Sequence, residues 1–572
     1  MTRLIPKQWQ LARANPEGRR LLAQALNVTP FTAQILLNRG IASPEAALQF
    51  LKPSLKNLPD PFLLPDMEKA VLRLIAAIQK KERIAIYGDY DADGLTSTAL
   101  LALFLRELEV EPILYIPDRV REGYGLHTKA LQKLKAQGVS LVITVDCGSK
   151  SHEVLRDADN SDLDVIVTDH HEIDEEPLKA FAFVNPKRLG ENGVGQELAG
   201  VGVVFFLLMA LRQKMRRENC FQKPEPNLKQ HLDLVALGTI ADMAPLIGIN
   251  RTLASFGLKE LATTQKAGLI ALKKIADLKL NTALFASDIG FRLAPRLNAG
   301  GRIAQASLGC DLLSATDPLR AEKIAKILDQ CNQDRQVLQE KHLQEAFQLI
   351  ALQENRFGLV VASQQWHPGI IGLVASKLTE NFFRPSVAFS IEKDFAKGSA
   401  RSIPGISIVE TLKECEEFLE QFGGHSLAAG LTLRADQLTN FGNRFEEILK
   451  EKMSSGSFTP TLHIDCELNI KDIDEKLLEE LSALQPFGIK NPEPVFWGRE
   501  LQFSDMRLVG KNHLKLKISD RMSQPLEAIG FNLGNLHPMK LSRGDAAFIP
   551  QWNTYQDTKT IQLKIRDIQT KY

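Results

Sequence analysis

Residues 87–94 read Tyr-Gly-Asp-Tyr-Asp-Ala-Asp-Gly and follow the short apolar run Ile84-Ala85-Ile86. The carboxylates of Asp89, Asp91 and Asp93 thus occupy alternate positions at the end of a predicted strand. Like charges this close repel one another, and burying any of them costs free energy unless a cation or a hydrogen-bond donor compensates. A divalent metal ion held by oxygen ligands is the compensation that this pattern indicates.

Other acidic or histidine-bearing segments also follow apolar runs. The run 141–145 leads into Asp146, the run 165–168 leads into Asp169-His170-His171, and a helical stretch leads into Asp242. Ligands collect outside the carboxyl ends of strands in an open parallel sheet, so we expect these side chains to be neighbours. The alternative for a single aspartate is a helix cap, and for Asp-His-His a solvated loop. Their joint occurrence at successive strand ends favours a metal site.

The composition is ordinary for a folded, soluble chain of several domains, with 44% hydrophobic and 24% charged residues in 572. The net charge of +1 neither favours nor excludes nucleic acid, so phosphates would have to meet local arginines or bound metal. There is no apolar signal segment at the N-terminus, and the longest apolar run, 201–211, is too short to span a bilayer. We expect that run to be a buried helix. Six scattered cysteines without a C-x-x-C pair predict a reduced, cytoplasmic protein.

Alternating strand-like and helix-like runs predict a doubly wound α/β domain, with strands at 84–87, 113–116, 141–145, 165–167 and 181–184. A charged helical run follows, then a second α/β pattern, a polar linker at 452–457 and short strands that predict a small β-barrel. The expected order is an N-terminal adaptor segment (1–66), a catalytic domain (67–310), a connector helix (311–355), a substrate-binding domain (356–452) and a barrel (460–572).

These motifs resemble those of the DHH phosphoesterase superfamily. The acidic motifs match at Gly88–Gly94, Val145–Gly148, Asp169–His171 and Gly238–Asp242, and Gly423–Gly430 resembles the glycine-rich motif of the associated second lobe. Further segments resemble motifs of the bacterial single-strand-specific exonucleases of that superfamily. They are 117–119, 122–125, 296–302, 366–369 and 398–402. The resemblance runs from about residue 50 to the end. It implies an α/β fold with two α/β lobes (DHH and DHHA1-like) joined by a long helix, plus a C-terminal OB-fold β-barrel.

The resemblance also implies an activity and partners. The expected protein is a metal-dependent exonuclease that degrades single-stranded DNA 5′→3′ by phosphodiester hydrolysis, in DNA repair and recombination. Its expected substrate is single-stranded DNA with a 5′ phosphate, and its expected protein partners are a helicase and a single-strand-binding protein. It is expected to be a cytoplasmic monomer without a membrane association.

The resemblance centres a pair of metal ions on Asp146. One imidazole among carboxylates suits Mn²⁺, and Mg²⁺ is the alternative. Two ions would clamp the attacking and leaving oxygens of a phosphodiester. The predicted ligands are Asp89, Asp91, Asp93, Asp146, His170 and Asp242.

Consecutive side chains of an extended backbone point in opposite directions, so we expect His170 and His171 not to share the metal. His170 is assigned to the metal, and His171 to the phosphate as a hydrogen-bond or proton donor. The predicted catalytic residues are His171, Asp93 and Asp169.

The second lobe is expected to bind the terminal phosphate through a small-residue loop, Gly398–Ser402, in which hydroxyls accompany a guanidinium. For these residues the alternative is a capped turn with a surface arginine. Two arginines of the first lobe are expected to grip phosphates as well, with ordinary surface ion pairs as the alternative. The predicted substrate-binding residues are Arg119, Arg302, Ser399, Arg401, Ser402, Gly424 and His425.

The barrel is expected to hold the strand through a basic face, since four residues alternate along one predicted strand: Lys511, His513, Lys515 and Lys517. Phe496, Trp497 and Phe503 are either stacking residues or core residues, and core packing is favoured because a small barrel needs large residues inside.

Two other functions fit parts of the pattern. One is a small-substrate relative that cleaves oligoribonucleotides, nucleotide phosphates or pyrophosphate. Such relatives are typically shorter and lack the barrel. The other is a binding scaffold similar to the silent DHH relative of the eukaryotic replicative helicase, which the full set of acids and histidines disfavours.

Overall fold

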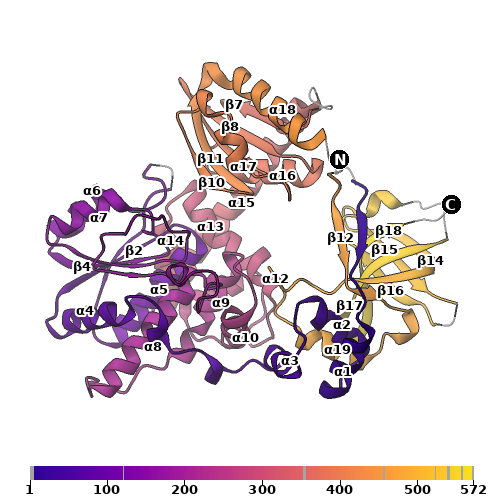
Figure 1. Cartoon of the computed structure of the whole chain (residues 1–572), viewed down its shortest axis with the longest axis horizontal. Coiled ribbons are helices and arrows are strands. Elements are labelled where there is room, and N and C mark those ends of the chain that lie inside the picture. Colours follow the sequence, from indigo (N-terminus) through magenta and orange to yellow (C-terminus); the bar gives the residue numbers. More distant parts are fainter. Residues whose placement is uncertain are drawn as a thin grey trace. The chain divides into compact units, whose positions relative to one another are not determined.

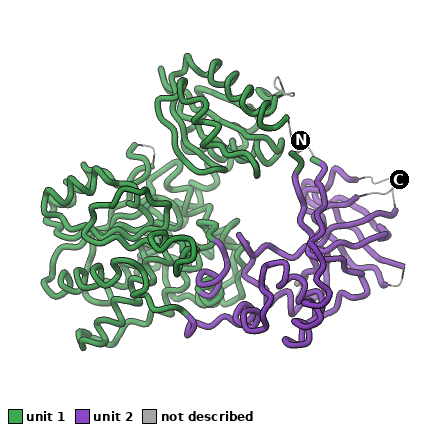
Figure 2. Tube along the Cα trace, in the orientation of Figure 1, with its two compact units in different colours: residues 1–5, 58–244, 253–459 green, residues 6–57, 245–252, 460–572 purple. Residues whose placement is uncertain are grey.

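The computed structural model describes residues 5–119, 121–351, 356–454, 458–521, 523–537, 542–555 and 558–569. The chain divides into two compact units that alternate along the sequence (Figure 2). The first unit contains residues 58–244 and 253–459, and the second contains residues 6–57, 245–252 and the chain from 460 onward. Within the described ranges, no helix is both long enough and apolar enough to cross a membrane.

A five-stranded parallel sheet lies at the centre of the first lobe of unit 1. Its order is β3-β2-β4-β5-β6, and the predicted strands are confirmed with small shifts of their ends. The order reverses between β2 and β4, which creates a topological switch point at the carboxyl ends of these two strands. The strands are β2 (Arg83–Gly88), β3 (Ile113–Tyr115), β4 (Val139–Val145), β5 (Asp164–Thr168) and β6 (Ala182–Val184).

Helices cover both faces of this sheet, as expected for strands that read as continuous apolar runs. Figure 1 shows α6 and α7 on one side of β2 and β4, and α4 and α8 on the other. The predicted buried helix at 201–211 is confirmed as part of α8. The helices are α4 (Met67–Gln79), α5 (Ala92–Glu107), α6 (Thr128–Ala136), α7 (His152–Asp159), α8 (Gly200–Arg217) and α9 (Leu232–Ala241).

The chain then continues through helices to the second lobe. Most of the predicted connector (311–355) is α15 (Pro318–Ile350), whereas its first three residues end the preceding helix. Asp317 caps this 33-residue helix by accepting hydrogen bonds from the amides of Leu319 and Arg320. The last four residues of the predicted connector, 352–355, lie outside the described residues. The preceding elements are α10 (Gly248–Ala262), α11 (Ala267–Ile275), α12 (Ala286–Asp288), the π-helical turn η5 (Ile289–Leu293), α13 (Ala294–Ile303) and α14 (Ser307–Leu313).

The second lobe is a five-stranded mixed sheet of order β10-β11-β9-β8-β7. Its elements are β7 (Leu359–Ser363), α16 (Ile371–Phe382), β8 (Ser386–Glu392), β9 (Phe395–Arg401), α17 (Ile408–Lys413), β10 (Gln421–His425), β11 (Ala428–Arg434) and α18 (Leu438–Ser454). The small-residue loop expected at Gly398–Ser402 is wrong, because residues 398–401 belong to β9 and pair with both β8 and β11. Of the predicted linker, 452–454 end α18, and 455–457 lie outside the described residues.

The barrel forms in unit 2. Its sheet has the order β13-β14-β15-β16-β18-β17 and closes through pairing of β14 with β17, which confirms an OB-like barrel. Phe496 and Phe503 are buried in its core, so stacking on DNA is excluded for both rings. The strands are β13 (Cys466–Glu467), β14 (Phe496–Val509), β15 (His513–Ser519), β16 (Leu526–Gly530), β17 (Arg543–Tyr555) and β18 (Thr558–Gln569).

The N-terminal segment packs on the barrel and shares its hydrophobic core. Its strand β1 (Gln8–Leu11) pairs in parallel with β12 (Thr461–Ile464), and Trp9 lies edge-on to Trp497 with ring centroids 5.5 Å apart. Apolar residues of α1 (Pro16–Leu26), α2 (Pro30–Asn38) and α3 (Pro44–Leu51) join the cluster that contains the barrel core. Residues 6–57 and the barrel therefore form one packed body.

Candidate metal centre

Three carboxylates gather where β2 ends and α5 begins. Asp89 is 5% exposed, and Asp91 caps α5 by accepting hydrogen bonds from the amides of Asp93 (3.0 Å) and Gly94 (3.1 Å). Asp93 lies deeper, and its carboxylate accepts hydrogen bonds from the amides of Gly200 (2.7 Å) and Val201 (2.9 Å). These amides begin α8, where the helix dipole also favours a negative charge. The cap interpretation is thus confirmed for Asp91, although the same side chain also faces the cluster.

Asp146 occupies the centre of the group at the end of β4. Its backbone is left-handed, with φ of 62°, and the residue is only 2% exposed. A Cβ atom on Gly200 would lie 2.6 Å from Asp146 Oδ1 and 2.7 Å from its Cβ, so only glycine fits at that position. The start of α8 can therefore approach the carboxylate closely because residue 200 has no side chain.

The Asp-His-His segment is a turn around its own carboxylate rather than an extended strand. Asp169 Oδ1 accepts hydrogen bonds from the amides of His170 (2.7 Å) and His171 (3.1 Å) and lies 2.7 Å from His171 Nδ1, while Oδ2 accepts one from the Ser149 amide (2.9 Å). The expectation that the two imidazoles point in opposite directions is wrong, because this turn places their ring centroids 4.5 Å apart. His170 Nε2 and His171 Nδ1 lie 3.1 Å and 3.9 Å from Asp146 Oδ1.

Asp242 completes the cluster from the C-terminal end of α9. His170 Nε2 lies 4.0 Å from Asp242 Oδ2 and 3.9 Å from Asp93 Oδ2. Every predicted ligand therefore lies in this region although the residues are about 150 positions apart in sequence. Three sets of side chains each bring their ligand atoms within 4.8 Å of one another: Asp89, Asp91 and Asp146; Asp93, His170 and Asp242; and Asp146, His170 and His171.

Several buried polar atoms at the centre form no hydrogen bond with the described residues: Asp89 Oδ1, Asp146 Oδ1 and His170 Nε2, of which the last two approach each other to 3.1 Å without hydrogen-bond geometry. An unpaired buried polar atom costs free energy, and all three converge on the same region. Carboxylate oxygens with one imidazole nitrogen are a donor set that suits Mn²⁺ and accepts Mg²⁺. The residues present thus fit a divalent metal site.

Burial and mutual repulsion hold several acids of the centre in their neutral form without metal. Burial, then the charge of Asp91, raises the pKa of Asp93 to about 7, and burial with the charges of Asp93 and Asp91 raises that of Asp242 to about 9. Burial and the charge of His171 lower the pKa of His170 to about 4, which leaves its imidazole neutral and able to act as a ligand. Burial opposes protonation of His171, but the hydrogen bond and charge of Asp169 outweigh it and raise its pKa to about 9.

We expect Asp242→Asn to raise the melting temperature of the metal-free protein at pH 8. Between the ordinary pKa of 3.8 and the folded value of about 9, folded wild-type protein keeps a proton that the unfolded chain has lost. The stability of the wild type therefore falls as the pH rises through this window. The asparagine side chain carries no titrating proton, so the variant does not lose this stability. The difference between variant and wild type should disappear below pH 4. Thermal unfolding in EDTA from pH 3.5 to pH 9 measures it, and equal melting temperatures at pH 8 would contradict the raised pKa.

A cluster of arginines lies beside the acids. Burial, then the charges of Arg119, Arg335 and Arg401, lowers the pKa of Arg302 to about 9, which shows how closely these guanidinium groups gather. Arg119 lies over the ring of Tyr90 at 4.9 Å, and Arg302 donates a hydrogen bond to the Gly369 carbonyl at 3.3 Å. No carboxylate forms an ion pair with Arg119, Arg302, Arg335 or Arg401 within the described part of the chain. Crowded cations without acidic partners favour an anionic ligand.

The structure joins some predicted substrate-binding residues to this cluster and not others. Arg401 Nη1 donates a hydrogen bond to Ser399 Oγ at 2.9 Å, next to Gly372, where a Cβ would lie 3.1 Å from that hydroxyl. The Ser402 hydroxyl donates to the Ile406 carbonyl at 2.7 Å, so it has a structural partner. Gly424 and the exposed His425 lie on β10, separated from β9 by β11, and no interaction joins them to the arginines among the described contacts.

Sequence reasoning missed several residues that shape the site. Arg335 lies in the charged connector helix, where nothing in the pattern distinguishes it from solvated neighbours. Asn298, whose Oδ1 accepts a hydrogen bond from the Ala92 amide at 2.8 Å, lies in the matched segment 296–302 but was given no role of its own. Ser149 is a polar residue without a spacing signal. Gly200 precedes an apolar run, and a glycine at the start of a predicted buried helix is the only hint of a close approach.

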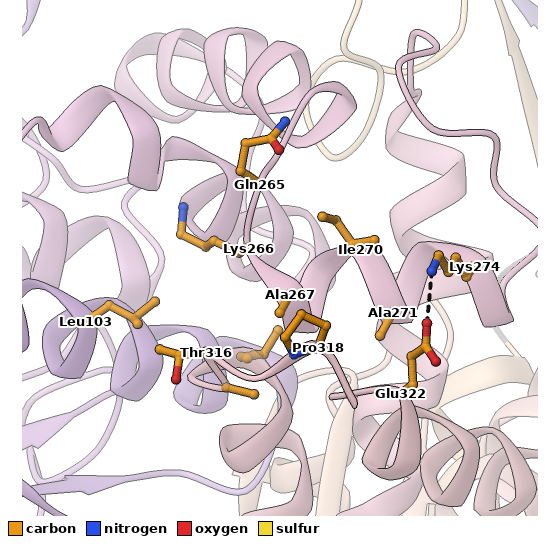
Figure 3. A pocket seen from close by; sticks show the side chains of 12 residues that line it. Leu103, Gln265, Lys266, Ala267, Ile270, Ala271, Lys274, Thr316, Pro318 and Glu322 are labelled. Atoms are coloured by element: carbon orange, nitrogen blue, oxygen red, sulfur yellow. Dashed lines mark hydrogen bonds and ion pairs between the residues drawn. The ribbon is translucent and has the colours of Figure 1, made fainter. Parts of the chain in front are cut away.

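A separate cavity of about 340 Å³ lies between α5, α11 and the start of α15. Its walls include Leu103, Ile270 and Pro318, and Lys274 pairs with Glu322 at its edge (Figure 3). None of the acids or histidines of the metal centre lines this cavity. It is therefore not part of the candidate site.

Comparison with known proteins agrees with this architecture. Family models match for the DHH family N-terminal domain (residues 83–239), the DHHA1 domain (355–451) and the RecJ OB domain (464–567). The chain is 38% identical over 570 residues to the single-stranded-DNA-specific exonuclease RecJ of Bacillus subtilis, covering 98% of this chain and 70% of that protein. It is 36% identical to the Escherichia coli RecJ over 88% of this chain and 89% of that protein.

Solved structures of RecJ proteins also resemble the whole fold of this chain. The crystal structure of RecJ from Thermus thermophilus in complex with Mn²⁺ matches with a TM-score of 0.84 and 28% identity, covering 99% of this chain and 80% of that one. The Mg²⁺ complex from the same organism matches with a TM-score of 0.78, 27% identity and coverage of 99% and 79%. The sequence similarity extends over nearly the whole chain, and all three domain types are matched. The chain therefore belongs to the RecJ family of DHH proteins.

Proposed function

We propose that this chain is a metal-dependent exonuclease that degrades single-stranded DNA 5′→3′ by phosphodiester hydrolysis, in DNA repair and recombination. The observation that carries the proposal is the convergence, at the switch point of the sheet, of buried oxygen and nitrogen atoms that form no hydrogen bond with the described residues. The relatives named above are single-stranded-DNA-specific exonucleases, and their solved structures contain Mn²⁺ or Mg²⁺. We assign the same substrate class and the same ions, two per chain, to this protein.

The geometry supports a division of the ligands between two ions. One would be held by Asp89, Asp91 and Asp146, and the other by Asp93, His170 and Asp242, with Asp146 between them. Asp93 already accepts two backbone hydrogen bonds, so it would offer its remaining lone pairs. These hydrogen bonds to the start of α8 fix the orientation of the Asp93 carboxylate before a metal binds.

The bound ions would supply an activated water and neutralise charge on the scissile phosphate. The chain's own contribution is orientation and a proton. The Asp169 carboxylate is engaged by the amides of its own turn, by the Ser149 amide and by His171, so its role is to orient His171 and favour its protonated form. Protonated His171 can then donate a hydrogen bond to the phosphate or a proton to the leaving oxygen.

The arginine cluster would receive the 5′-terminal phosphate. Arg401 with Ser399 and Arg302 with Arg119 approach from the two lobes, and their mutual repulsion would be relieved by a dianionic ligand. A terminal phosphate carries more negative charge than an internal phosphodiester, which favours cleavage from a 5′-phosphorylated end. Such a site supports the proposed 5′→3′ polarity, in which the 5′-phosphorylated end is held beside the metal centre.

One assay tests the proposal and its alternatives. End-labelled single-stranded DNA, double-stranded DNA and RNA would be incubated with the protein in Mn²⁺, in Mg²⁺ and in EDTA. Release of nucleotides from the 5′ end of single-stranded DNA, with none in EDTA, is the expected result. Cleavage of only short oligoribonucleotides or pyrophosphate would favour the small-substrate alternative, and binding without cleavage would favour a scaffold. The expected helicase and single-strand-binding partners, the monomeric state and the cytoplasmic location are parts of the same proposal.

Removal of the Arg401 side chain is expected to weaken the preference for 5′-phosphorylated over 5′-hydroxyl strands by roughly tenfold to a hundredfold. A charge-assisted contact between guanidinium and phosphate contributes about 1.5–3 kcal/mol, and the Ser399 hydroxyl that it holds would be released as well. The measurement is kcat/KM for paired substrates that differ only at the 5′ end. Arg434→Ala on the adjacent strand is the control, because that guanidinium pairs with Asp436. An unchanged preference in Arg401→Ala would place the terminal-phosphate site elsewhere.

The basic face of the barrel gives a separate prediction. Lys517 pairs with Asp505 at 2.7 Å and Lys515 with Glu527 at 3.2 Å. Lys511 was predicted on the same strand, but β15 begins only at His513, so that lysine lies in the turn before it. Lys511 and Arg507, which is the partner of Lys515 on β14, are exposed and form no ion pair with a described residue. We expect the double substitution of Arg507 and Lys511 by alanine to reduce the salt slope of single-strand binding by about 1.4, at roughly 0.7 per lost phosphate contact. Binding titrations at four salt concentrations measure the slope. Lys517→Ala serves as the comparison, and equal slopes in all proteins would show that this face does not hold DNA.

A further inference from the structure

The most exposed ring of the described chain stands at one end of the helix that flanks the metal centre. Phe291 is 82% exposed, more than any other large apolar side chain among the described residues. It lies in the π-helical turn η5, which continues directly into α13. Such turns occur frequently at functional sites, and an exposed ring on one is a candidate contact surface.

Phe291 shares a helical face with residues that reach the metal centre. Successive turns of η5 and α13 place Phe291, Pro295, Asn298 and Arg302 on that face, and all four are at least partly exposed. Asn298 accepts a hydrogen bond from the first amide of α5 at 2.8 Å, and Arg302 belongs to the arginine cluster. At 1.5 Å per residue, Phe291 stands roughly 10 Å along the face from Asn298.

Neighbouring side chains hold the turn that presents this ring. Arg292 donates hydrogen bonds to the carbonyls of Ala276 and Asp277, the latter at 2.8 Å. Arg296 donates from Nε to Asp329 Oδ1 at 2.8 Å. Both guanidinium groups are therefore occupied by protein partners, and the exposed end of the face offers a ring rather than a cation.

A second apolar side chain lies next to the metal ligands. Met243 directly follows Asp242, is 67% exposed and has a left-handed backbone with φ of 60°. A non-glycine residue rarely adopts this conformation, and here it presents an apolar side chain to solvent beside the acidic cluster. Helix α9, which leads into Met243, packs against η5.

We propose that Phe291 and Met243 form an apolar ledge on which bases of the substrate strand stack as it leaves the metal centre. The face carries cations where phosphates would be held and apolar groups farther away, which suits the alternation of phosphate contact and base stacking in single-strand binding. Asn298 contacts the backbone between Asp91 and Asp93, so it marks the metal-centre end of the face. At about 3.4 Å per stacked nucleotide, the roughly 10 Å from Asn298 to Phe291 corresponds to about three nucleotides. This inference rests on the proposed function.

The test is strand binding to full-length protein made inactive by Asp146→Asn. The probes are 5′-phosphorylated 12-mers of single-stranded DNA, either intact or with one abasic position moved from position 1 to position 8. Stacking on one ring predicts a loss of affinity at a single position near the third or fourth nucleotide. Phe291→Ala should weaken binding of the intact strand by about tenfold and abolish that position-dependent loss. Phe291→Trp should retain both the affinity for the intact strand and the loss of affinity at that one abasic position.

Kinetics of the active protein give a second readout. Phe291→Ala should raise KM for long strands without changing kcat, and should not affect a dinucleotide, which is too short to reach the ring. Leu319→Ala is the matched control, because Leu319 is 70% exposed on the first turn of α15, beside the separate cavity. If Phe291→Ala behaves like Leu319→Ala and the abasic profile is unchanged, the ledge is refuted while the proposed function stands. If the unaltered chain neither binds nor cuts single strands, the proposed function fails and the ledge fails with it.

Discussion

Replacing Asp146 by asparagine is expected to abolish cleavage of single-stranded DNA, with a fall in kcat of at least about a thousandfold. The Asp146 carboxylate lies between the two sets of ligands, and its Oδ1 is buried without a hydrogen-bond partner. Loss of its charge would weaken the binding of both ions. Metal-ion catalysis lowers the activation barrier by several kcal/mol, and each 1.4 kcal/mol corresponds to roughly tenfold in rate. Asparagine keeps the size of the side chain and tolerates the left-handed backbone at this position, so the fold should be retained.

The variant should be at least as stable as the wild type when both are measured in EDTA. Burial and the charges of Asp93, Asp91, Asp89 and Asp242 raise the pKa of Asp146, so its charge is unfavourable in the metal-free fold. Asp162→Asn is the matched control, because Asp162 also has a left-handed backbone but is exposed and lies before β5 rather than after β4. A folded Asp146→Asn protein that cleaves at a near-normal rate would contradict the assignment of this centre.

Gly200→Ala is expected to reduce kcat by about a hundredfold or more without removing any chemical group of the centre. The added Cβ would lie 2.6 Å from Asp146 Oδ1, and its contact with the Asp146 side chain cannot be relieved without moving the carboxylate or the start of α8. The Gly200 amide also donates to Asp93, so both carboxylates would shift. Displacements near 1 Å at a reacting centre cost on the order of a hundredfold in rate.

Gly202→Ala provides the comparison two residues further along α8. Its Cβ would approach only the end of the flexible Leu198 side chain, at 2.8 Å, which can move away. Steady-state kinetics in Mn²⁺, together with thermal unfolding of both variants, separate a local displacement from general loss of stability. If Gly200→Ala and Gly202→Ala have equal kcat, the close approach of α8 to Asp146 does not matter for catalysis.

Local patterns were sufficient to predict the sheet and the gathering of its acids. Each predicted strand of the first lobe is a parallel strand of one sheet, and the groups that follow the strands share one edge. Asp89, Asp146 and His170 were therefore found without knowledge of long-range contacts. The orientation of the two histidines could not be predicted in this way. It depends on Asp169 accepting hydrogen bonds from the amides that follow it, which turns the backbone at the position where an extended strand was assumed.

Other features depend on contacts between segments far apart in sequence. The segment Gly398–Ser402 looks like a loop because its residues are small, yet pairing with β8 and β11 makes most of it a strand. The N-terminal segment looks like a separate adaptor, yet Leu22 and Leu36 lie in the same core as Phe548. Deleting the barrel alone near Ser455 would therefore expose the apolar side of residues 6–57, which is why point substitutions on the barrel face test DNA binding more cleanly.

The central claim is that this cluster of acids and histidines holds the metal ions of catalysis. Anomalous diffraction at the manganese absorption edge, from crystals grown with Mn²⁺, tests it most directly. We predict two peaks about 3.5–4 Å apart on either side of the Asp146 carboxylate, one near Asp89 and Asp91 and the other near His170 and Asp242. A map without manganese at Asp146, or with its peaks only at other carboxylates of the chain, would contradict the account.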